Sequence, residues 1–176
     1  MVRHALSGGI SMQYIISALL AVVTLAACGS GSSVTLPQQK KATLVFAAST
    51  SASLPTAVRG ISISARIPAG VTVPLLPGST EVASGVLEAL KTGSIIGNYS
   101  APVLRIQAFD VSSASGLGLD NVRQFARITL PVEDSVTEGS FTALNPSFPE
   151  FSATGKITNN TVDLSTYLKP SMKVTF

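Results

Sequence analysis

The stretch Arg59-Gly-Ile-Ser-Ile-Ser-Ala-Arg-Ile67 decides the fold of this chain. Four apolar residues, beginning at Ile61, alternate in it with two serines and an arginine. A period of two places the apolar side chains on one face of a strand and the polar ones on the other. The stretch therefore predicts a half-buried β-strand, with Ile63 in the core and Ser62 on the opposite face.

Short runs of the same kind, separated by Gly, Pro, Asn and Ser, continue to the C-terminus. For the segment 85–90 a strand is favoured, and a helix over 81–91 is the alternative because Val82, Val86 and Leu90 recur every four residues. About nine short strands predict an all-β fold, a two-sheet jelly-roll sandwich. The other strands are expected over 42–48, 71–73, 94–100, 103–110, 122–132, 147–154 and 171–176.

The N-terminal segment has the pattern of a signal peptide. An apolar run over 14–27 follows Arg3, ends in Leu25-Ala-Ala27 and directly precedes Cys28. The run is shorter than the about 20 residues that a membrane-spanning helix needs, and it ends in small residues, as processing sites do. A plain N-terminal anchor helix and a secreted soluble protein are the alternatives.

The four residues that end at Cys28 resemble the lipobox of bacterial lipoproteins. The resemblance implies that the signal peptide is cleaved before Cys28 and that the thiol of Cys28 is acylated, for example with palmitate. It also implies that the protein lies outside the cytoplasm, on the outer membrane or the cell surface. Gly29, where inner-membrane lipoproteins have Asp, favours the outer membrane. The expected organisation is a signal peptide over 1–27, a lipidated cysteine and flexible tether over 28–41, and a sandwich over 42–176.

Composition argues against most catalytic chemistry. The 176-residue chain has one His and one Cys, and both precede the expected domain. A His-containing triad or zinc site is therefore excluded there, and no Gly-rich phosphate loop is present. The basic residues are scattered, so a nucleic-acid surface is not expected. We expect that the protein is not an enzyme, that it has no catalytic residue, and that it binds no cofactor and no metal.

Two pairs of carboxylates leave weaker alternatives. Asp110 and Asp120 flank a Ser/Gly-rich loop and are a possible calcium pair. Glu133 and Asp134 are adjacent, so on a strand they would point to opposite faces, and a turn is favoured over an acid/base pair. An unrecognised hydrolase subunit is a third function class that these residues leave open.

The order of the strand patterns resembles cohesin-like domains, whose sandwich is shared with several carbohydrate-binding modules. The segments that carry the resemblance are 59–73, 92–99, 103–110 and 125–132. It implies docking of a protein partner, with polysaccharide binding as the alternative. The chain departs from a sugar-binding module because it has no Trp, and aromatic rings are what usually stack on sugars.

Two segments are candidates for partner binding. Leu75 and Leu76 stand between two prolines, in a loop that is either tucked against the sandwich or exposed as an apolar contact. Arg123, Phe125 and Arg127 alternate on the predicted non-core face of the strand 122–132. They form either an aromatic and cationic binding strip or a packed Phe125 covered by the arginine stems.

Overall fold

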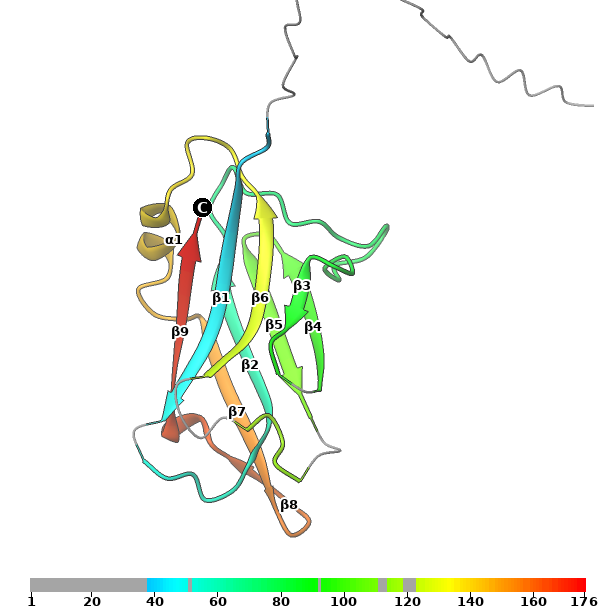
Figure 1. Ribbon diagram of the computed structural model, residues 1–176, viewed down its shortest axis with the longest axis vertical. Helices are drawn as coiled ribbons and strands as arrows, with labels where there is room; N and C mark the ends of the chain where they lie inside the picture. The colour runs from blue at the N-terminus through cyan, green and yellow to red at the C-terminus, as the bar shows by residue number, and fades with distance from the viewer. Residues whose placement is uncertain (1–37, 51, 92, 111–113, 119–122) are drawn as a thin grey trace, which may run out of the picture. The chain divides into compact units, whose positions relative to one another are not determined.

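The computed structural model describes residues 38–50, 52–91, 93–110, 114–118 and 123–176. Residues Pro37–Phe176 form one compact unit (Figure 1). Its elements in chain order are β1 (Lys41–Thr50), β2 (Val58–Arg66), β3 (Leu87–Ala89), β4 (Ser94–Ser100), β5 (Val103–Phe109), β6 (Arg123–Pro131), α1 (Glu138–Leu144), β7 (Glu150–Ile157), β8 (Asn160–Asp163), a 3₁₀ turn (Ser165–Tyr167) and β9 (Leu168–Thr175).

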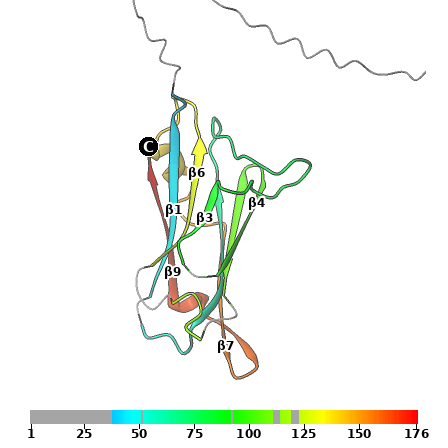
Figure 2. The same ribbon diagram turned by 45° about the vertical axis from the view of Figure 1, so that its right-hand side comes forward.

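The strands form two antiparallel sheets. Sheet A has the order β3-β6-β1-β9, and sheet B has the order β4-β5-β2-β7-β8. Figures 1 and 2 show the two sheets as separate layers, with β1, β6 and β9 in one and β4 and β7 in the other. The predicted all-β, two-sheet sandwich is confirmed.

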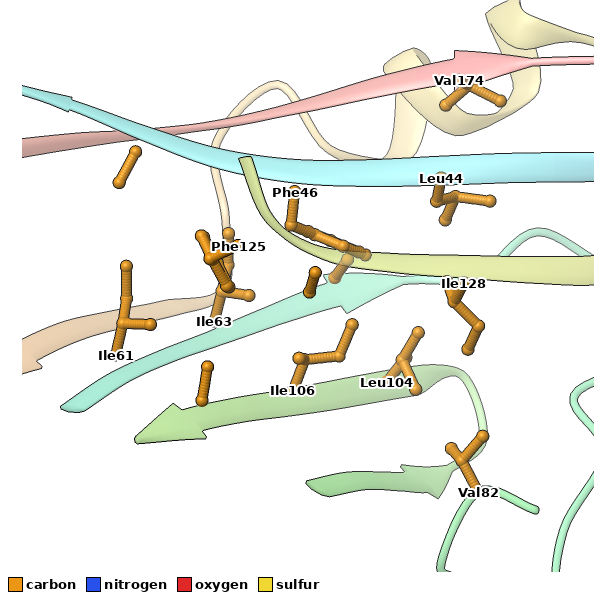
Figure 3. Close-up of a cluster of buried hydrophobic side chains, with 14 of the residues drawn as sticks. Leu44, Phe46, Ile61, Ile63, Val82, Leu104, Ile106, Phe125, Ile128 and Val174 are labelled. Carbon is orange, nitrogen blue, oxygen red and sulfur yellow. The ribbon is translucent and has the colours of Figure 1, made fainter. Parts of the chain in front are cut away.

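The core fills the space between the sheets. Alternate residues of the central strands point inward, among them Leu44 and Phe46 from β1, Ile63 from β2 and Ile128 from β6, and each has no exposed surface (Figure 3). The predicted inward position of Ile63 is confirmed. Ser62, beside Ile63, lies on the outer face, as the alternation requires.

The helix considered over 81–91 is wrong. This segment crosses from one sheet to the other: the amide of Val82 donates to the carbonyl of Gly97 in β4 at 2.9 Å, and Leu87 pairs with Ile128 in β6. Gly97 leaves the space for this crossing, because a Cβ there would lie 2.9 Å from the side chains of Val82 and Leu87. Gly85 turns the chain between the two contacts with a φ of 82°.

Strand β7 lies three residues further along the chain than the predicted strand 147–154. The predicted end of this strand at residue 154 is wrong, because the strand continues to Ile157 and the chain turns at 158–159 into β8. Gly155 is in the strand for a packing reason. A Cβ there would lie 2.9 Å from the carbonyl oxygen of Ala57 and from the side chain of Leu164.

Helix α1 has no counterpart in the sequence-based expectation. It begins with a capping box formed by Thr137 and Ser140, and it buries Phe141. The side chain of Asn145, at the C-terminal end of the helix, makes the two hydrogen bonds to β2 that the backbone of a neighbouring strand would make. Its side-chain oxygen accepts from the amide of Arg66 at 2.7 Å, and its nitrogen donates to the carbonyl of Arg66 at 2.8 Å.

The point where the chain enters the sandwich is fixed by Lys40. Its ammonium group donates to the carbonyl of Val136 at 2.7 Å and lies 4.7 Å from the centre of the Phe176 ring. That ring meets Phe141 edge to face, with 6.4 Å between the ring centres. The first strand, the helix and the C-terminus are thereby held together at one end of the sandwich.

Candidate functional site

Phe125 is not a surface residue, and its predicted place in a binding strip is wrong. It is 1% exposed and lies in the core near Ile63 (Figure 3). The reason is a β-bulge between β6 and β1. Phe46 pairs with Ala126, but its neighbour Ala47 pairs with Gln124, so Phe125 is an extra residue in β6. A bulge interrupts the alternation, and both Phe125 and Ala126 point inward.

The two arginines of the predicted strip lie in different surroundings. Arg127 is on the outer face of sheet A, where its guanidinium group lies 3.2 Å from the carboxylate of Glu88. Arg123 is half-buried at the start of β6, beside a hollow of about 680 Å³ that residues of the 53–58 and 115–118 segments also line. Since Phe125 between them faces the core, the three residues do not form one surface.

Leu75 and Leu76 are exposed, each with 37% of its surface accessible. They belong to a small hairpin: Leu75 pairs with Val82, and the amide of Leu76 donates to the carbonyl of Glu81 at 2.9 Å. Glu81 pairs in turn with Asn98 of β4. The loop therefore extends the β4 edge of sheet B. Of the two predicted arrangements, tucked against the sandwich or exposed, the structure shows the exposed one.

The outer face of sheet B has a row of small residues along its centre. On β2 three successive outward positions are Gly60, Ser62 and Ser64, while the flanking strand β5 carries a longer side chain opposite each of them. The register sets Gln107 opposite Ser62 on one side and Ser152 opposite it on the other. The result is a shallow trough along β2, which we call the β2 trough.

An ion pair closes the β2 trough over Ser64. Arg105 of β5 and Glu150 of β7 both stand opposite Ser64, and the guanidinium group of Arg105 donates to the carboxylate of Glu150 across it. The hydroxyl of Ser64 donates to the same carboxylate oxygen at 3.2 Å, and Ser64 has no exposed surface. Both charged side chains remain about half exposed, so the pair adds little stability but presents both charges to a partner.

The other end of the β2 trough is a hollow over Gly60 of about 480 Å³. Gly60 forms its floor, since a Cβ there would lie 3.0 Å from the hydroxyl of Thr154. The hollow is lined by hydroxyl groups, cationic side chains and one aromatic ring, from Arg59, Phe109, Thr154, Lys156, Thr158 and Thr161. Its lining is therefore mixed, with polar and apolar surface side by side.

Aromatic rings do not form a row on this face. Phe109, half-buried, is the one aromatic residue at the outward positions of β2, β4, β5, β7 and β8, all of which the structure describes in full. A stack of sugar rings along the sheet therefore has one point of contact. Ile96 of β4, 37% exposed, is a large apolar side chain on the same face, but the register pairs it with Gln107 and pairs Phe109 with Ser94.

The described residues contain no group of three or more His, Cys, Asp or Glu side chains that could hold a metal ion. Asp110 is buried, with 4% of its surface exposed, and Asp120, its predicted calcium partner, lies outside the described residues. Glu133 and Asp134 are both exposed in a turn, as expected.

The carboxylate of Asp163 has a pKa below its usual value. The pKa is lowered because the hydroxyl and the amide of Ser165 both donate to it, at 2.6 Å and 2.8 Å. These bonds hold the chain as it leaves β8, and the hydroxyl of Ser165 also accepts from the amide of Ala153 at 3.0 Å. The pKa shift is explained by this turn, so it does not point to an acid or base of a reaction.

Comparisons with protein-family models, curated proteins and solved structures find no match. No helix of the described residues is long and apolar enough to cross a bilayer. Cys28 and the segment predicted as signal peptide lie outside the described residues, as does the tether up to residue 37.

Proposed function

We propose that this chain is a lipid-anchored, non-enzymatic docking module, held on the outer membrane or cell surface through Cys28, which binds a protein partner on the outer face of sheet B. The observation that carries the proposal is the β2 trough, a sheet face that the described residues leave uncovered, with a charged pair across one end. The resemblance of the chain's strand order to cohesin-like domains also favours docking of a protein partner.

The size and chemistry of this face suit a protein partner. Five strands about 4.8 Å apart and about seven residues long span about 19 Å by 23 Å, which approaches the contact area of a small transient complex. Such interfaces are only about as apolar as the rest of a protein surface, so a polar trough fits them. Arginine, here Arg105, is one of the side-chain types that most often contribute strongly to binding energy at protein interfaces. Leu76 and Ile96 add exposed apolar surface at the β4 edge.

The proposal is tested by filling the trough. Ser62→Arg places a long side chain at its centre, on the outer face and away from the core. The matched control is Ser171→Arg, on the outer face of sheet A. We expect the first variant to lose capture of the partner from cells and the second to keep it, with both melting at the same temperature within about 2 °C. Equal capture by both variants would contradict the proposal.

Polysaccharide binding is the second candidate, and the hollow over Gly60 is the observation that favours it. Its hydroxyl groups and the ring of Phe109 suit one sugar unit. A polysaccharide array probed with the domain tests this function, with Phe109→Ala as the variant that removes the stacking surface. Binding to the array that Phe109→Ala abolishes and Ser171→Arg does not would favour a glycan over a protein.

The loop of Leu75 and Leu76 is a rival place for the protein contact. Each leucine is exposed, and a charge there would not enter the core. Leu76→Asp is therefore expected to leave the fold intact. If Leu76→Asp abolishes capture while Ser62→Arg does not, the docking surface is the hairpin at the β4 edge and not the trough.

A further inference from the structure

The outer face of sheet A, opposite the β2 trough, is cationic. Its outward positions carry four basic side chains and one carboxylate. The register distributes these side chains over all four strands of the sheet. These residues are Lys41 of β1, Arg127 of β6, Lys169 and Lys173 of β9, and Glu88 of β3. We call this surface the lysine face.

Three of these charges have no ion-pair partner among the residues that the structure describes. Arg127 is paired with Glu88 at 3.2 Å. Lys41, Lys169 and Lys173 are exposed, and no carboxylate of the described part of the chain lies within ion-pair distance of them. The positions between them carry short uncharged side chains, such as those of Thr43 and Ser171, so the charges stand on an even surface.

We propose that the lysine face lies on the anionic headgroups of the membrane, an inference that rests on the proposed lipid anchor at Cys28. Residues 29–40 join Cys28 to the first strand. At most about 3.5 Å per residue, they hold Lys41 within about 45 Å of the acylated cysteine. Each lysine near an anionic membrane is attracted to it, and a flat sheet brings all three to the surface at once.

Protection of a sheet edge explains only part of this pattern. β9 is the edge strand of sheet A, and Lys169, Pro170 and Lys173 are residues that commonly prevent an edge from pairing with another chain. Lys41 belongs to β1, an interior strand, where no edge needs protection. The charge therefore extends across the face and is not confined to its border.

The arrangement has a consequence for docking. The two sheets of a sandwich pack about 10 Å apart with their outer faces pointing in opposite directions. With the lysine face on the membrane, the β2 trough points away from it. A partner then reaches the trough without meeting the bilayer.

The test is vesicle co-sedimentation of residues 38–176, which contain all the described elements and the whole core. We expect binding to phosphatidylcholine vesicles with about one third phosphatidylglycerol at about 20 mM salt, and none to pure phosphatidylcholine or at about 500 mM salt. The double variant Lys169→Ala/Lys173→Ala is expected to bind the anionic vesicles with an affinity at least about tenfold lower than that of the parent. Arg66→Ala/Lys156→Ala, on the opposite face, removes the same charge and is expected to bind within about twofold of the parent.

Two results would overturn the inference. Equal weakening by both double variants would show that net charge, and not the lysine face, attracts the protein. Absence of binding to the anionic vesicles at low salt would show that the face does not recognise lipid. The assay uses neither the acyl chains nor the partner, so its failure is distinguishable from failure of the anchor, seen by lipid labelling, or of the docking face, seen by capture.

Discussion

Replacement of Phe125 by Ala should destabilise the domain strongly, although strict alternation along β6 places this residue at the surface. The ring is 1% exposed and lies between the sheets near Ile63 and Phe46 (Figure 3). Truncation of a buried Phe typically costs 3–5 kcal/mol, because the transfer free energy of the ring is lost and a cavity remains. For a domain of this size the cost corresponds to a fall in melting temperature on the order of 10 °C.

Chemical denaturation followed by far-ultraviolet circular dichroism measures the cost. Gln124→Ala is the matched control, because Gln124 is the neighbouring residue and its side chain is exposed. It should change the free energy of unfolding by less than about 0.5 kcal/mol. If Phe125→Ala costs less than about 1 kcal/mol, or if Gln124→Ala costs as much, the bulge and the inward position of Phe125 are refuted.

Four further predictions concern the core, the helix, the anchor and the absence of a metal. Ile63→Ala should cost about 2–5 kcal/mol and Ser62→Ala under about 0.5 kcal/mol in the same assay, and equal losses would refute the register. Asn145→Ala should cost about 1–3 kcal/mol, since it leaves backbone groups of β2 unpaired, and an unchanged melt would refute that role. Cys28→Ser should abolish labelling by a palmitate analogue, and persistent label would exclude acylation there. A chelator should leave the melting temperature unchanged, and a shift of several degrees would reveal a metal.

Alternation of apolar and polar residues was sufficient to predict most strands. It located β2, β4 and β5 to within one residue, because these strands have one buried and one exposed face. It failed at Phe125 because a bulge is a property of the pairing between two strands. Nothing in the sequence of β6 shows that β1 shifts its register beside it.

Helix α1 was missed for a different reason. It has seven residues and a single buried side chain, Phe141, so it offers no helical period to recognise. Its capping box at Thr137 has Ser at the third position and not the usual Glu or Gln, which removes the clearest local signal. Contacts with Asn145 and Phe176 hold the helix in place, and both depend on the tertiary fold.

The candidate docking face was not predictable from the sequence. Ser64, Arg105 and Glu150 lie far apart in the chain and meet only because β2 stands between β5 and β7. The exposure of Leu75 and Leu76 was one of two predicted arrangements, since prolines indicate a loop but not what it contacts. Strand order and register, which local patterns do not encode, decide where the site lies.

Site-specific photo-crosslinking in cells tests the docking face most directly. A benzophenone amino acid at position 62 reports contacts in the β2 trough, and the same probe at position 171 reports contacts on the opposite sheet. We predict that irradiation produces a discrete protein adduct from position 62 and none from position 171. An adduct from position 171 with none from position 62 would contradict the assignment of the docking face to sheet B.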